Sequence, residues 1–280
     1  MNPRPSYFRV FLTFVRNSLV RDMMFPTNFI IETISSFGWV MMNVGFYLLI
    51  FKYTSQIGPG TSAGDAWDKY QFFVFIATSM FINSIVQMFF MTNADEFSEL
   101  IRTGGLDFAL LKPIDTQFLI SLRKIEWASF SNFLVAAALM IYALPRVEGF
   151  HLTIWQVILY PIYVGAGVVI LYSLMIVLAA VSVWLGRNTS IYDFWFYITT
   201  FSRYPMEIYN GSIGNLLRLG FTFVLPVLIV VNVPARMLAK PLRAEYAPLA
   251  LFAIAATIGS FMVSRWVFQR ALLSYRSASS

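Results

Sequence analysis

Few side chains in this 280-residue sequence belong to the types that perform covalent or metal chemistry. The chain has no cysteine, which excludes disulfides, thiolate metal sites and cysteine nucleophiles, and His151 is its single histidine. The one glycine-rich run, residues 58–64, lacks the Gly-Lys-Ser/Thr sequence that a phosphate-binding loop requires. We therefore expect no catalytic residue, no metal site and no nucleotide site in the chain itself.

Three amide side chains stand inside apolar stretches that are long enough to cross a bilayer. Asn83 and Gln87 are one helical turn apart and share a helix face, while Asn43 lies deep in an earlier stretch. Polar groups in hydrocarbon are costly and usually face the interior of a helix bundle. Two interpretations remain open: the three residues line a translocation path, or they form hydrogen bonds that hold helices together.

The charged segment 93–113 reads NADEFSELIRTGGLDFALLKP and predicts a short helix at a membrane face. Asn93 and Glu96 have the spacing of an N-cap and its capping-box partner, and Gly104-Gly105 is typical of a helix end. We interpret this helix either as a docking element or as a plain connector. As a docking element it would place apolar anchors in a partner's groove and charges at the rim; the anchors are Phe97, Leu100 and Ile101, and the rim charges are Glu96, Glu99 and Arg102.

Composition shows which elements position these residues. The chain is 58% hydrophobic and 12% charged, with a mean hydropathy of +0.68. A soluble domain carries about twice that charged fraction. The sequence therefore predicts an all-α polytopic membrane protein, a single transmembrane domain over 1–280 with an amphipathic interfacial helix in 1–26. Six crossings are expected, at residues 27–51, 70–91, 125–144, 155–185, 190–233 and 248–268.

The fifth crossing, residues 190–233, is expected to be broken. It contains the Tyr204-Pro205 pair, Pro226 lies inside its second apolar piece, and Pro234 bounds that piece. Proline removes a backbone donor, and such breaks survive at membrane depth only where protein or water satisfies the freed groups. We expect two pieces, one of them re-entrant, with the second piece on the outer side.

Basic residues predict the orientation, with both termini and the 93–124 loop in the cytoplasm. The net charge of +6 then reflects this bias, because no basic stripe lies on a soluble module that could bind nucleic acid. The residues that support the assignment are Arg4, Arg9, Arg16, Arg21, Arg187, Arg265, Arg270 and Arg276. Three basic residues depart from it, because six crossings put Arg236, Lys240 and Arg243 outside.

The run ELIRTGGLDFALLKP, residues 99–113, resembles the E-x-I-R-x-G-x-L-D-x-x-L-L-x-P stretch of type-2 ABC exporter permeases. The resemblance is to a branch of bacterial permeases whose substrates are mostly unassigned. FSRYPMEIY at 201–209, VLP at 224–226 and NVPA at 232–235 are similar to the same branch, so the resemblance covers nearly the whole chain.

The resemblance implies an interfacial N-terminal helix, six spans, a cytoplasmic coupling helix between spans two and three, and a broken fifth region. It assigns ATPase coupling to a set of residues in 93–113: Glu96, Phe97, Glu99, Leu100, Ile101, Arg102, Gly104, Gly105, Leu106, Asp107, Lys112 and Pro113.

The implied function is that of the permease subunit of an exporter in the bacterial plasma membrane. Two copies, identical or paired with a sister permease, would sit on an ABC ATPase dimer that binds ATP and Mg. They would move an apolar or amphipathic substrate by alternating access. An ATP-independent dimeric carrier or channel is the alternative. An intramembrane enzyme is disfavoured, because the spans offer almost no clustered His, Asp, Glu or Ser.

Overall fold

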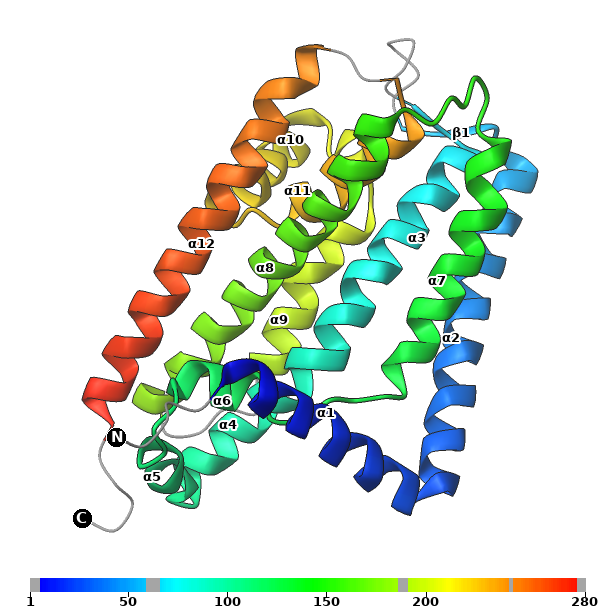
Figure 1. Cartoon of the computed structure of the whole chain (residues 1–280). Coiled ribbons are helices and arrows are strands. Elements are labelled where there is room, and N and C mark those ends of the chain that lie inside the picture. Colours follow the sequence, from blue (N-terminus) through cyan, green and yellow to red (C-terminus); the bar gives the residue numbers. More distant parts are fainter. Residues whose placement is uncertain (1–5, 59–65, 186–190, 242–243, 276–280) are drawn as a thin grey trace.

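The computed structural model describes residues 6–58, 66–185, 191–241 and 244–275, and these residues form a helical bundle (Figure 1). Five helices in this part of the chain are long and apolar enough to cross a membrane, and a bent helix pair makes a sixth crossing. The prediction of an all-α polytopic membrane protein is therefore confirmed. Arg4, Arg187, Asn188, Arg243, Arg276 and most of the glycine-rich run lie outside the described residues.

The first two helices meet at a sharp elbow. Helix α1 (Tyr7–Met24) lies across one end of the bundle, as expected for an interfacial helix, and α2 (Pro26–Tyr53) then runs along the bundle (Figure 1). Pro26 occupies the first turn of α2, where its missing N–H would have no helical acceptor. Most of the α2 surface is apolar and exposed, and the helix packs mainly against α7 (Ser129–Ala143).

A short hairpin at the opposite end, β1 (Gln56–Ile57) with β2 (Trp67–Asp68), leads into the second crossing. Helix α3 (Lys69–Val86) starts with a capping box formed by Asp68 and Gln71. It continues through a π turn (Gln87–Met91) into α4 (Thr92–Arg102), so residues 69–102 form one helical rod. We call the end of the bundle that holds β1 the β1 end. The opposite end holds α1, α4 and α5 (Gly105–Leu110), and we call it the α5 end.

The remaining elements complete the six crossings and bring α1 and the end of α12 to the same end of the bundle (Figure 1). They are α5 (Gly105–Leu110), α6 (Thr116–Leu122), α7, a 3₁₀ turn (Leu144–Arg146), α8 (Ile154–Leu185), α9 (Ile191–Thr200), two 3₁₀ turns (Phe201–Arg203 and Met206–Ile208), α10 (Gly211–Leu219), a π turn (Gly220–Val224), α11 (Leu228–Ala239), a 3₁₀ turn (Ala244–Tyr246) and α12 (Ala247–Ser274). The main core lies where α3, α8 and α11 pack together, and α12 covers α8.

The fifth crossing is broken, as predicted. The helix Gly211–Val224 and α11 meet at 90° around Pro226, in the half of the bundle nearer the β1 end (Figure 1). The expectation that Pro234 bounds the second piece is wrong, because Pro234 lies inside α11. Its missing N–H leaves the Val230 carbonyl without a helical donor. Gly167 of α8 approaches that oxygen so closely that an added Cβ would lie 2.9 Å away.

Candidate functional site

The segment predicted to couple the chain to a partner forms a compact helical hairpin at the α5 end. Helix α4 stops at Thr103 because Gly104 adopts a left-handed φ of 71°, a conformation that costs little only for glycine. Helix α5 then reverses the chain, and Asp115 caps α6 by accepting the Phe118 N–H at 3.0 Å. The Gly104-Gly105 helix stop is therefore confirmed.

The predicted N-cap at Asn93 is wrong. No glycine or proline interrupts residues 69–102, so the helix continues through Asn93 with its neighbours in helical conformation. The Asn93 side chain instead donates to the Lys124 carbonyl at 2.7 Å and accepts the Lys124 N–H at 2.9 Å. Asn93 thus joins the second crossing to the start of the third.

The three predicted apolar anchors point into the chain's own fold. Phe97 is 1% exposed and its ring lies 5.6 Å from that of Phe268 in α12. Leu100 and Ile101 are half-buried against the same cluster, which also contains residues of α6 and α8. Phe97 therefore has no surface left for a partner's groove. The expectation that this face of α4 docks on a partner is wrong for Phe97, because the chain's own fold covers that side chain.

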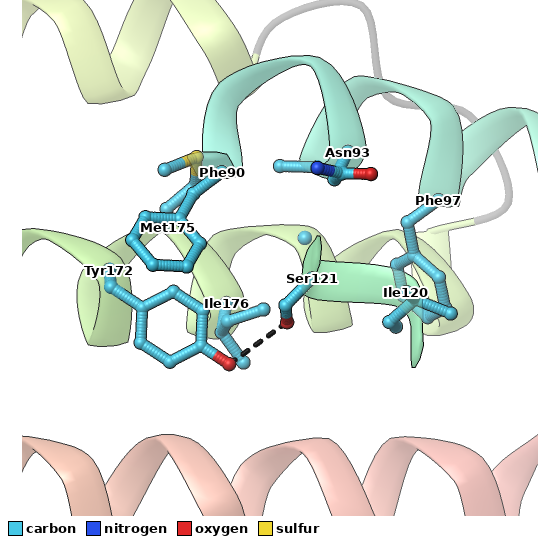
Figure 2. A pocket seen from close by; sticks show the side chains of 10 residues that line it. Phe90, Asn93, Phe97, Ile120, Ser121, Tyr172, Met175 and Ile176 are labelled. Atoms are coloured by element: carbon cyan, nitrogen blue, oxygen red, sulfur yellow. Dashed lines mark hydrogen bonds between the residues drawn. The ribbon is translucent and has the colours of Figure 1, made fainter. Parts of the chain in front are cut away.

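Figure 2 shows how tightly this cluster joins α4 and α6 to α8. Phe97 and Ile120 lie side by side, and the Ser121 hydroxyl bonds the Tyr172 hydroxyl at 2.9 Å. The cavity between them measures about 10 Å³, room for about one water. Such packing makes a stiff mechanical joint and leaves no room for an organic ligand.

A polar network that the sequence did not predict fastens the hairpin to α12. Arg265 forms an ion pair with Asp115 and donates to Gln117 at 3.0 Å. Gln117 in turn donates to the Tyr172 hydroxyl of α8 at 3.0 Å. Arg265 and the backbone N–H of Phe118 together hold the pKa of Asp115 below its usual range. Asp115 was not singled out in the sequence, because nothing local to it indicates that an arginine 150 residues away is its partner.

Helix α1 is attached to the same region through the residues before α7. The Ser18 hydroxyl accepts the Ile125 N–H at 3.0 Å, and Arg21 donates to the Ile125 carbonyl at 3.3 Å. Glu126 accepts from the Thr92 hydroxyl of α4 at 3.1 Å. Burial raises the pKa of Glu126, and the charges of Glu32 and Asp22 add to the effect. The elbow before α2 is thereby linked to the hairpin.

The exposed tip of the hairpin presents three large apolar side chains. Phe108 is 73% exposed and Leu111 is 81% exposed, with Leu110 beside them. We call Phe108, Leu110 and Leu111 the tip cluster. Leu106 lies inside the fold between α4 and α12, whereas Lys112 and Pro113 are exposed next to the tip.

The charges of the hairpin are divided between internal and external roles. Glu96 forms an ion pair with Lys124 of the chain itself, so it is not free to serve as a rim charge. Glu99 and Arg102 pair with each other on the exposed face, with Arg102 Nε donating to Glu99 Oε2 at 2.9 Å. Asp107 is half-buried at the start of α5.

Asn43, Asn83 and Gln87, from two separate crossings, line one cavity of about 430 Å³ between α2 and α3. Asn43 and Asn83 each donate to the carbonyl one turn back in their own helix, at 2.8 Å. Both of these hydrogen bonds stay within one helix, so the contacts of the described residues do not support the interpretation that Asn43 and Asn83 hold helices together. The other lining residues are Ser35, Ser36, Trp39, Val40, Val44, Tyr47, Ile76, Ser79, Met80, Ser84, Asn132 and Arg203.

Two of the three basic residues that departed from the charge rule, Arg236 and Lys240, are held in a buried network near the β1 end. Arg236 is 8% exposed and donates to Glu207 at 2.5 Å, and its guanidinium lies 3.8 Å from the Tyr246 ring centre. Trp67 also donates to Glu207, at 2.9 Å, and Lys240 donates to the Ala66 carbonyl at 2.9 Å. These charges act as internal links and not as a loop charge, so the rule does not apply to them.

Asn232 of α11 holds the turn that Pro205 begins. Its side chain accepts the Met206 N–H at 2.9 Å and donates weakly toward the Tyr204 carbonyl. Among the residues that the structure describes, no three His, Cys, Asp or Glu side chains are grouped to hold a metal ion.

The comparisons with known proteins agree with this architecture. The family described as "ABC-2 family transporter protein" matches residues 26–279, from the elbow to the C-terminal region. No curated protein and no solved structure gives a match. Because the match covers nearly the whole chain, including the hairpin, the cavity and the broken crossing, this protein belongs to the ABC-2 family of transporter proteins.

Proposed function

We propose that this chain is the permease subunit of an ATP-driven exporter and that the tip cluster docks on its ABC ATPase. The supporting observation is the contrast within one hairpin. Phe97 and Leu106 are buried in the cluster that packs the hairpin against α8 and α12, while Phe108 and Leu111 are exposed on the protein surface. Buried apolar anchors carry most of the energy of a docking contact, and neighbouring charges set register and encounter rate.

The proposed coupling follows the covalent and packed connections of the hairpin. Helix α4 is continuous with α3, so a displacement of the tip moves one wall of the cavity directly. Residues 124–127 link the hairpin to α1, and the elbow at Pro26 links α1 to α2, the other wall. Both cavity walls are thereby joined to the docking hairpin, as alternating access requires.

The partner supplies the hydrolysis in this proposal. ATP and Mg bind to the ATPase dimer, and the permease contributes no nucleotide site. A second permease copy, identical or a sister chain, would pair with this one in the bacterial plasma membrane, with both termini in the cytoplasm. The substrate is apolar or amphipathic, because apolar side chains such as Trp39, Val40 and Met80 line the cavity.

Leu111→Ser tests the docking contact. Co-expressed with a candidate ABC ATPase from the same genome, the variant should retain the fold but co-purify several-fold less ATPase, because burying a leucine contributes about 2 kcal/mol. Leu152→Ser is the matched control, since Leu152 is also exposed but belongs to the loop between α7 and α8. That loop lies at the β1 end (Figure 1). Equal ATPase recovery with both variants would show that the tip cluster is not the docking surface.

The same preparation distinguishes the exporter from the alternative, an ATP-independent carrier. Wild-type permease and ATPase in proteoliposomes should hydrolyse ATP faster together than the ATPase alone. A permease that binds no ATPase, yet transports an amphipathic solute down its gradient, would support the carrier and contradict the exporter.

A further inference from the structure

The cavity between α2 and α3 has a polar composition that points to one kind of ligand. Among the described residues that line it, Arg203 alone carries a charge. Arg203 lies in the 3₁₀ turn that follows α9, inside the broken fifth crossing. A charged side chain inside a membrane-spanning region is costly and marks a substrate path or a specific partner.

Arg203 lies toward one end of an elongated cavity. The lining residues of α2 run from Ser35 to Tyr47, about 18 Å of helix. Arg203 follows α9, which runs from the α5 end toward the β1 end (Figure 1), so it lies at the end of the cavity nearer β1. Its guanidinium also lies 4.9 Å from the Phe196 ring centre. A guanidinium presents planar N–H donors in a geometry that suits an acidic group.

The rest of the cavity combines an apolar wall with amide groups. Trp39, Val40 and Met80 provide apolar surface along its length. At the other end, the side-chain oxygen of Asn132 is buried and has no hydrogen-bond partner among the described residues. A buried polar atom without a partner costs about 1–3 kcal/mol, so a bound molecule that donates to it gains by entering.

We propose that this cavity is the substrate site and that it binds an amphipathic organic anion. The acidic group pairs with Arg203, and the apolar body lies along Trp39, Val40 and Met80. This assignment rests on the proposed transport function, whose substrate class it specifies. The volume of about 430 Å³ lies within the range of small-molecule pockets.

The test is a binding measurement on the permease alone, in lipid nanodiscs. Three probes share one ω-bromodecyl chain and differ in their head groups, which are sulfonate, hydroxyl and trimethylammonium. Bromine quenches tryptophan fluorescence on contact, and Trp39 lines the cavity, so Trp39→Phe defines its share of the signal. Empty nanodiscs correct for partition of each probe into lipid.

Wild type should bind the sulfonate about ten-fold more tightly than the alcohol, since a charge-assisted pair provides roughly this discrimination. Arg203→Gln should abolish that preference, and Arg203→Lys should retain part of it. Arg146→Gln is the control, because Arg146 also stacks on an aromatic ring, at 4.1 Å from the centre of Tyr142, but is exposed near the β1 end.

Equal affinities for the three probes, or a preference for trimethylammonium, would overturn the assignment. So would an unchanged sulfonate preference in Arg203→Gln. Should that variant not fold, the order of the three probes in wild type still decides. The measurement needs no ATPase, so a permease that prefers the sulfonate but engages no ATPase contradicts only the exporter. An ATPase-coupled permease without the preference contradicts only the anion site.

Discussion

At the scale of single residues, the pairing of Arg236 with Glu207 explains a charge distribution that basic-residue counting could not. Both side chains are buried in the described structure, and Trp67 donates to the same carboxylate. The charge rule leaves Arg236 on the unexpected side, and nothing in the sequence shows that its partner, Glu207, lies 29 residues upstream. Buried charges are tolerated where they are paired and hydrogen-bonded.

Glu207→Gln should therefore be strongly destabilising. Removing one charge of a buried pair costs on the order of 3–5 kcal/mol, because the other charge stays in the protein interior. The double variant Glu207→Gln/Arg236→Met should recover much of the loss. Thermal unfolding in detergent checks both. A single variant with wild-type stability would show that the pair is not buried as described.

The buried carboxyl of Glu126 should make the free energy of unfolding depend on pH with the opposite sign to that of an ion-paired surface carboxylate. Burial raises its pKa, so the folded protein binds the proton more tightly than the unfolded chain does. The stability that this group contributes is fully present below its unfolded pKa of about 4.3. It is lost as the pH rises through the folded pKa.

Glu126→Gln should accordingly raise the melting temperature at pH 8 and leave it unchanged near pH 4. Gln keeps the acceptor for the Thr92 hydroxyl but carries no buried charge. Melting curves of both proteins over that pH range are the measurement. A variant that is less stable than wild type at pH 8 would contradict the assigned burial cost.

At the scale of elements, the contact between α8 and α11 depends on a proline, which has no backbone N–H, and on a glycine, which has no Cβ. Pro234 frees the Val230 carbonyl, and Gly167 brings α8 close enough to face it. Close approach of backbones through small residues is a common way to pack helices in membranes. This contact holds the second piece of the broken crossing against the bundle.

Gly167→Ala should destabilise the protein by about 1–3 kcal/mol, because the added methyl group would meet backbone and two core side chains. Gly165→Ala, in the same helix with nothing within 4 Å, should be neutral or slightly stabilising. Chemical unfolding of the two variants in the same detergent compares them. Equal effects at both positions would contradict the close approach.

Elements controlled by local backbone chemistry were predictable from the sequence. Gly104 stops α4, Pro26 starts α2, and Pro226 breaks the fifth crossing, each through its own conformational restriction. Asn93 misled the capping interpretation because its side chain has a partner in the third crossing. The surroundings of Phe97 could not be predicted either. Amphipathic spacing shows which face of a helix is apolar, but it does not show whether the same chain or a partner covers that face.

At the scale of the whole molecule, the hairpin, the elbow and the cavity form one connected unit. The α5 hairpin is packed into α8 and α12 and hydrogen-bonded through residues 124–127 to α1. The path from the tip cluster to the cavity therefore needs no flexible connector within the described residues.

The absence of native cysteine makes the orientation directly measurable. Single cysteines at Ser6 and Ser98, on the α1 and α4 segments, should be protected from an impermeant maleimide in intact cells. A cysteine at Leu152, which is exposed in the loop between α7 and α8, should react. The positions Ser62 and Ser277, which serve the same purpose, lie outside the described residues. Labelling of Ser98→Cys from outside would reverse the orientation and remove the docking hairpin from the cytoplasm.

Cross-linking from the tip tests the central claim most directly. A photoactivatable maleimide attached to Leu111→Cys should cross-link the ABC ATPase in the assembled complex, with an efficiency that changes when ATP is bound. The same reagent at Leu152→Cys should give no product, because the loop between α7 and α8 that holds Leu152 lies at the opposite end of the bundle (Figure 1). An ATPase that co-purifies but cross-links to neither position, or to Leu152→Cys alone, would contradict the docking of the ATPase on the tip cluster.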